Sequence, residues 1–119
     1  MKNDNIIEMK SKAFAIRIVK LARYLQGEKH EFILSKQLLR SGTSIGANVK
    51  EALRGQSKAD FTAKMNIALK EASETEYWLE ILHETDCLPD FEFDSAHADN
   101  KEILRILMSI VKTSRKEQV

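Results

Sequence analysis

Apolar residues recur along this chain at helical spacing in four separate segments. In the first segment, about residues 5–26, they step by one or two helical turns and share one face. The members of this face are Ile7, Phe14, Ile18, Leu21 and Leu25. A second stripe beside it contains Ile6, Met9, Ala13 and Ile16. Gly27 follows, and a glycine at this point predicts a helix end in the left-handed conformation.

The second segment, about residues 30–54, has its apolar residues within one arc of about 140° around a helix. Gly42 and Gly46 lie inside this arc, one turn apart. A glycine in a helix interior costs about 1 kcal/mol relative to alanine. Two glycines on a packing face therefore favour a neighbouring helix in unusually close contact. A kink or a frayed stretch in a long helix is the alternative.

The third segment, about residues 58–85, repeats apolar or small residues at alternating steps of four and three, as in a coiled-coil seam. This seam consists of Phe61, Met65, Ala68, Ala72, Thr75, Leu79 and Leu82. Ser57 and Asp60 resemble a capping box at the start of the segment, with Ser57 accepting from the amides of the first turn.

Pro89 interrupts the chain, and a fourth helix is predicted over about residues 94–113, capped by Asp94 or Ser95. Its inward residues are Ile103, Leu107 and Ile110, and the residues after it are expected to fray. Four amphipathic helices joined by short turns predict an all-α fold, an antiparallel up-down-up-down four-helix bundle, with residues 1–119 as a single domain. The apolar arcs of the first and fourth helices are wider than packing along a single seam requires. The additional apolar surface either supports self-association or closes a compact core.

The composition is that of a globular chain, with 43% hydrophobic and 31% charged residues among 119. Cys87 is the only cysteine, so no internal disulfide can form and a reducing compartment fits. The N-terminus has no apolar run of signal-peptide length, and no stretch has the apolar length of a membrane span. We therefore expect a cytoplasmic protein with no membrane partner.

Charge is unevenly distributed although the net charge is only +1. Residues 1–60 carry twelve Lys or Arg against six Asp or Glu, whereas residues 61–90 carry two against seven. Four basic residues lie opposite the apolar arc of the second helix and form a ridge about 27 Å long, at ~1.5 Å per residue. They are Lys36, Arg40, Lys50 and Arg54, and the first helix adds Lys12, Lys20 and Arg23.

Such a basic ridge can contact the phosphates of RNA, and each contact makes binding more sensitive to salt. No aromatic residue interleaves with it, so base stacking is not expected. An ordinary solvated helix face is the alternative. On the acidic third helix, Glu71, Glu74 and Trp78 share a flank. Either Glu71 or Glu74 pairs with Arg40 or Arg54 on a neighbouring helix, or the flank is a subunit interface anchored by Trp78, in a head-to-tail contact that closes a ring.

Enzymatic chemistry finds little support in the sequence. Glu80 and His83 have the i, i+3 spacing of a di-metal bundle site, and Asp94 with His97 is the only near match. We interpret these residues as part of an exposed acidic face, with no metal bound. Cys87 lacks a surrounding catalytic signature, and the glycines do not form a phosphate-binding loop. We therefore expect no enzyme, no catalytic residue, no cofactor and no small-molecule substrate.

Two runs of residues resemble a known family: SKQLLRSGTSIGANVKEA at 35–52 and SKADFTAKMNIALKEASETEYWLEIL at 57–82. They are similar to the four-helix bundle proteins encoded by intervening sequences of bacterial 23S ribosomal RNA genes. The resemblance implies a bundle that assembles into a ring, with a homopentamer expected. Accessory variability proteins of diversity-generating retroelements are similar in fold. They form basic pentameric barrels that bind nucleic acid and a reverse transcriptase, whereas this chain is near neutral.

The resemblance supplies no catalytic residue. Together with the charge pattern, it leads us to expect a non-enzymatic, homo-oligomeric helical-bundle protein that contacts RNA or a ribonucleoprotein through basic helix faces. The alternative is a protein–protein interaction scaffold that does not bind nucleic acid.

Overall fold

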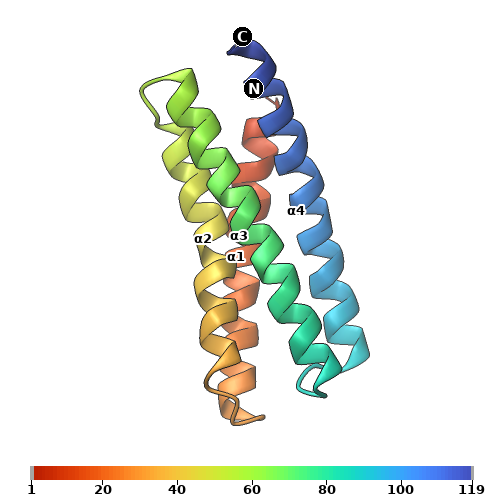
Figure 1. Cartoon of the computed structure of the whole chain (residues 1–119). Helices are drawn as coiled ribbons and strands as arrows, with labels where there is room; N and C mark the ends of the chain where they lie inside the picture. The colour runs from red at the N-terminus through yellow and green to blue at the C-terminus, as the bar shows by residue number, and fades with distance from the viewer. Residues whose placement is uncertain (1, 119) are drawn as a thin grey trace.

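Four long helices make up the computed structural model, which describes residues 2–118 (Figure 1). They are α1 (Lys2–Gly27), α2 (Leu34–Leu53), α3 (Lys58–Glu84) and α4 (Asp90–Glu117). Successive helices run antiparallel, and the molecule is a rod measuring 48 × 20 × 19 Å. The predicted all-α four-helix bundle is confirmed.

The core forms where the predicted apolar faces meet. All five members of the first face of α1 are buried, and the α3 seam is buried from Met65 to Leu82, with Phe61 partly buried at its start. The inward residues of α4, Ile103, Leu107 and Ile110, are buried as well. The second stripe of α1 behaves differently: Met9 is 69% exposed and Ile16 is 51% exposed. Surplus apolar surface on α1 therefore faces outward instead of closing the core.

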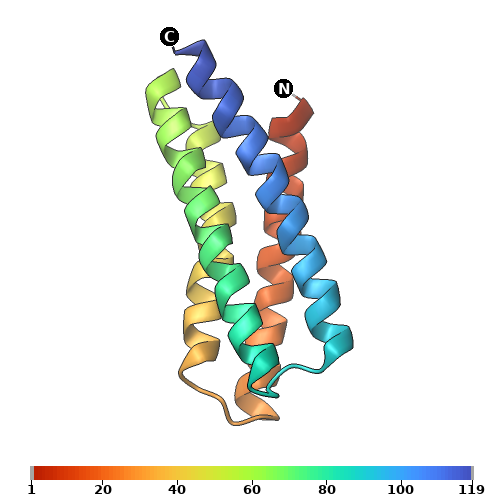
Figure 2. The ribbon, with the colours of Figure 1, turned by 45° about the vertical axis from the view of Figure 1, so that its right-hand side comes forward.

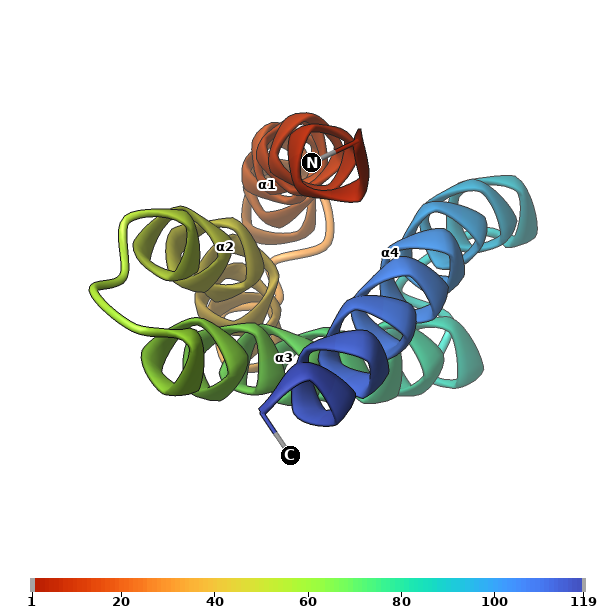
Figure 3. The ribbon, with the colours of Figure 1, turned by 90° about the horizontal axis from the view of Figure 1, so that it is seen from above.

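The helices are not equally associated. α2 packs extensively against α1 and α3, and α4 packs mainly on α3. α4 is inclined across α3, as the side view of Figure 2 and the view from above in Figure 3 show. Its contact with α1 is the slightest of the adjacent pairs. The α1–α2–α3 layer is consequently the most firmly packed part of the bundle.

The start of α2 differs from the predicted start at residue 30. His30 has a positive φ of 54°, which excludes it from a helix, and α2 begins at Leu34. The Glu31 carboxylate accepts a hydrogen bond from the Ser35 amide at 2.8 Å and so caps the first turn. No glycine has positive φ among the described residues, so the prediction of a left-handed Gly27 was wrong.

The fourth helix is longer than predicted at both ends. It begins at Asp90 directly after Pro89, so Asp94 and Ser95 lie inside the helix and do not cap it. Proline suits a helix start because its missing amide would have no partner there. At the other end α4 continues to Glu117, because a Thr62–Ser114 hydroxyl pair and a Lys58–Glu117 ion pair of 2.6 Å hold its last turns against α3. The predicted helix end at about residue 113 was wrong, and Val119, the last of the residues expected to fray, lies outside the described residues.

The two glycines of α2 lie where α1 comes closest. A Cβ atom on Gly42 would lie 2.8 Å from Cγ2 of Ile18, and one on Gly46 would lie 3.3 Å from the carbonyl oxygen of Ser11. α2 is one continuous helix through both positions. Close helix contact, and not a kink, accounts for the glycines.

We predict that Gly42→Ala destabilises the protein although alanine is the better helix former. The added methyl group overlaps Ile18, a buried, β-branched side chain with little freedom to move. We expect a net loss of about 1–2 kcal/mol in the free energy of unfolding, measured by urea titration and circular dichroism. Gly27→Ala is the matched control, because no atom lies within 4 Å of its added Cβ. It should gain about 0.5–1 kcal/mol, and equal stabilisation by both changes would contradict the packing account.

Candidate nucleic-acid interface

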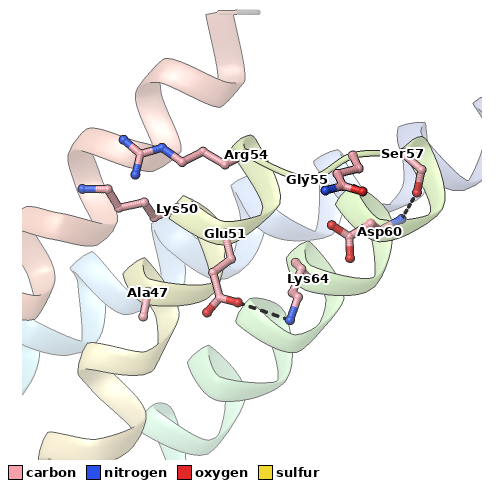
Figure 4. Close-up of a pocket in the computed structure, with 9 residues that line it drawn as sticks. Ala47, Lys50, Glu51, Arg54, Gly55, Ser57, Asp60 and Lys64 are labelled. Atoms are coloured by element: carbon pink, nitrogen blue, oxygen red, sulfur yellow. Dashed lines mark hydrogen bonds and ion pairs between the residues drawn. The ribbon is translucent and has the colours of Figure 1, made fainter.

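The basic side chains of α2 lie outside its buried arc. Lys36, Lys50 and Arg54 are exposed, and within residues 2–118 they make no ion pair. Figure 4 shows Lys50 and Arg54 extending from the same side of α2. We call Lys36, Lys50 and Arg54 the α2 ridge. Two cations on α2 and one at its C-cap, Arg54, thus present positive charge directly to solvent.

Arg40, the fourth predicted member, has a different environment. Its guanidinium binds Glu71 Oε1 at 3.3 Å and also binds the Glu74 carboxylate, joining α2 to α3. Trp78 donates from Nε1 to Glu74 Oε2 at 2.9 Å. The prediction that Arg40 pairs with an acid of the third helix is confirmed, for both glutamates. An intramolecular network thus occupies the flank of Glu71, Glu74 and Trp78, and its role as a subunit interface stays a prediction.

The basic residues of α1 divide between two flanks. Lys12, Lys20 and Arg23 are exposed on the outward side and form no ion pair with any described residue. On the flank facing α4, Lys10 pairs with Glu102 at 3.1 Å and Arg17 pairs with Asp99 at 2.9 Å. The exposed Met9 and Ile16 share the outward side of α1 by helical period. This side therefore combines positive charge with apolar surface.

A shallow recess of about 750 Å³ lies at the C-terminal end of α2 (Figure 4). Lys50 and Arg54 form one side of it, and Lys64 of α3 forms part of the other. Lys64 pairs with Glu51 at 3.3 Å. At the start of α3, Ser57 Oγ accepts a hydrogen bond from the Asp60 amide at 3.0 Å, which confirms the predicted cap. The recess has mixed charge, and Lys50 and Arg54 are the lining cations that form no ion pair with any described residue.

A second basic surface was missed in the sequence. The exposed side of α4 carries five basic residues that make no ion pair with any described residue: Lys101, Arg105, Lys112, Arg115 and Lys116. Residues 91–119 carry equal numbers of acidic and basic residues, so their net charge gave no sign of a basic surface. The acids lie mainly in the first half of this segment, and the order of the charges along the sequence could have revealed the surface.

The histidines and the cysteine do not form the arrangements weighed from the sequence. His83 contacts Asp90, with 2.7 Å between Nε2 and Oδ1, rather than joining Glu80. Cys87 is partly buried and accepts a contact from the Thr85 hydroxyl at 3.8 Å. A nucleophilic cysteine needs a base within hydrogen-bond reach of its sulfur. Among the described residues, no histidine or carboxylate forms such a bond with Cys87.

Together, these observations define the chain as an antiparallel four-helix bundle with charged outer helix faces. A family model described as 23S rRNA-intervening sequence protein matches residues 3–109, and the chain belongs to this family. A crystal structure from Bacteroides thetaiotaomicron, described as a protein with unknown function from the S23 ribosomal protein family, is similar in sequence and fold. It has 54% sequence identity and a TM-score of 0.91, and the match covers 92% of this chain and 98% of that chain.

No curated protein matches the chain. Among the described residues, none of the helices combines the length and the apolar character needed to cross a membrane.

We predict that Arg40 contributes to stability, unlike the α2 ridge. Arg40→Gln removes the ion pairs to Glu71 and Glu74 but leaves the Trp78 hydrogen bond in place. Because the Arg40 side chain is 49% exposed, the loss in the free energy of unfolding should be modest, up to about 1 kcal/mol. Lys36→Gln, the matched control on the same helix, should change it by less than about 0.5 kcal/mol. Equal losses in urea titrations of the two variants would contradict a structural role for Arg40.

Proposed function

We propose that this protein is a non-enzymatic, oligomeric helical-bundle protein that binds structured RNA through phosphate contacts of the α2 ridge. The observation that carries the proposal is that Lys36, Lys50 and Arg54 form no ion pair with any residue between 2 and 118, and that all three are exposed along α2 and its C-cap. Arg40 is excluded from the binding set because two glutamates already hold it. Lys12, Lys20 and Arg23 extend the positive surface onto α1.

The length of the ridge suits the backbone of a folded RNA. Lys36 and Arg54 are separated by about 27 Å along the helix, at ~1.5 Å per residue. Lysine and arginine on a rigid helix can contact several phosphates without local ordering of the chain. The ridge contains no aromatic side chain, so recognition depends on RNA shape and backbone and not on stacked bases.

The family description adds a genomic setting, because it refers to intervening sequences of 23S ribosomal RNA. This setting favours RNA over DNA as the ligand. The net charge of +1 implies that one chain binds weakly, since phosphate contacts supply most of the affinity in such complexes. Alignment of several ridges in a homo-oligomeric ring, with a pentamer as the expected form, would raise the affinity by multivalency.

The second candidate function is a protein–protein scaffold without RNA, and the exposed apolar residues favour it. Met9 and Ile16 lie on the outward side of α1, and Ile67 and Tyr77 are 40% and 55% exposed on α3. Apolar side chains on two different outer faces suit a head-to-tail contact between copies, with the basic face of α1 against the acidic α3. Trp78, Glu71 and Glu74 lie at the edge of this contact.

We predict that charge reversal of the α2 ridge abolishes most RNA binding. The variant Lys36→Glu, Lys50→Glu, Arg54→Glu should lose at least about tenfold in affinity for a labelled structured RNA in 50 mM salt. The slope of log affinity against log salt should also fall by about one per lost contact. Fluorescence anisotropy between 50 and 200 mM salt measures both quantities.

The matched control for this experiment carries Lys101→Glu, Arg105→Glu and Lys112→Glu on α4, which changes the net charge by the same amount. It should retain most of the affinity. Equal losses in the two triple variants would show that net charge and not the α2 ridge governs binding. A wild-type protein that does not bind at 50 mM salt would favour the scaffold function.

We predict that the outward apolar side of α1 supports self-association. In light scattering at micromolar concentration, the wild-type protein should have several times the chain mass of 13.6 kDa. The double variant Met9→Asp, Ile16→Asp should have the mass of a monomer in the same measurement, because two buried charges oppose the contact. Phe91→Asp is the control, since Phe91 is 74% exposed on α4. A monomeric wild-type protein would contradict the ring.

A further inference from the structure

A cluster of metal-binding side chains lies between the C-terminal half of α3 and the N-terminal half of α4. The ligand atoms of Glu76, Glu80 and His97 all lie within 4.8 Å of one another. The sequence drew attention to Glu80 with His83, but the packing of α4 on α3 brings His97 to Glu80 instead. All three side chains are half-buried, so their ligand atoms remain within reach of solvent.

The geometry of the cluster follows from the two helices. Glu76 and Glu80 are one turn apart on α3, which directs both carboxylates to the same flank. His97 approaches from α4, with 3.0 Å between its Nε2 atom and Glu76 Oε2. Its ring stacks on Phe93, with centroids 4.8 Å apart, and Phe93 also stacks on His83 at 4.2 Å. The aromatic stack fixes the plane of the His97 imidazole.

The electrostatics of the cluster favour a cation. No Lys or Arg among residues 2–118 forms an ion pair with Glu76 or Glu80. Two carboxylates of like charge thus share a partly desolvated site with one imidazole. Repulsion between them is relieved when a positive ion binds.

We propose that Glu76, Glu80 and His97 bind one divalent transition-metal ion of the Zn²⁺ class. One imidazole nitrogen with two carboxylate oxygens is a donor set that Zn²⁺ accepts, and three protein ligands leave a coordination position for water. Ligand atoms around tetrahedral Zn²⁺, with bonds of about 2.0–2.1 Å, lie closer together than 4.8 Å. Side-chain rotation therefore closes the cluster around the ion, and His97 Nε2 exchanges its contact with Glu76 for the metal.

The bound ion would cross-link α3 to α4. This link matters because α4 makes only slight contact with α1 and depends on α3 for its position. The site lies apart from the α2 ridge and does not rest on RNA binding.

Calorimetric titration of the EDTA-treated, dialysed protein with Zn²⁺ tests the proposal. We expect one saturable site per chain and a Zn²⁺-dependent rise in the thermal unfolding midpoint. His97→Ala and Glu80→Gln should each weaken binding at least tenfold and remove the rise. The matched controls are His30→Ala, an exposed loop histidine, and Glu84→Gln, an exposed glutamate of the same helix. Both controls should bind as the wild-type protein does.

Absorption of the Co²⁺-loaded wild-type protein gives a second measurement that requires no variant. Visible d–d bands of a low-coordinate Co²⁺ ion bound by nitrogen and oxygen are expected, and Zn²⁺ should displace them. Absence of saturable binding in the wild-type protein would overturn the proposal. Full binding in both His97→Ala and Glu80→Gln would do the same, because it would place the ion elsewhere.

Discussion

The close approach of α1 to α2 at Gly42 is the constraint on which the outer surface of this protein depends. With Ile18 filling the space that a side chain at Gly42 would need, α2 can be rotated only a little about its axis. Lys36, Lys50 and Arg54 lie outside the buried arc of α2, so they must then face solvent. The same interior contact that fixes the bundle therefore fixes the direction of its positive charge.

The charges of the chain divide into those that hold the bundle together and those that remain exposed. Arg40, Arg17 and Lys10 each bridge two helices, whereas the α2 ridge bridges none. The number of basic residues on a helix does not show which of them bridge helices and which remain exposed, since both kinds occur on the same helix. Ion pairs between helices occupy Glu71 and Glu74 of α3 and Asp99 and Glu102 of α4, so the near-neutral net charge is compatible with an unpaired basic face.

The periodicity of the sequence predicted the inward faces correctly, because burial of apolar side chains imposes it directly. Helix ends were predicted less well, since they depend on single contacts such as the Glu31 carboxylate at the start of α2. The grouping of His97 with Glu76 and Glu80 was beyond prediction, because it depends on the register between α3 and α4. The basic surface of α4 could have been predicted from the order of charges in the sequence, but the net charge of residues 91–119 does not show it.

RNA contact with the outward face of α2 is the central proposal. Lysine footprinting tests this claim most directly, by comparing acetylation rates of single lysines with and without a bound structured RNA. Lys36 and Lys50 should be protected by RNA, while Lys101 and Lys112 on α4 continue to react. Protection of the α4 lysines with unchanged rates at Lys36 and Lys50 would contradict the account.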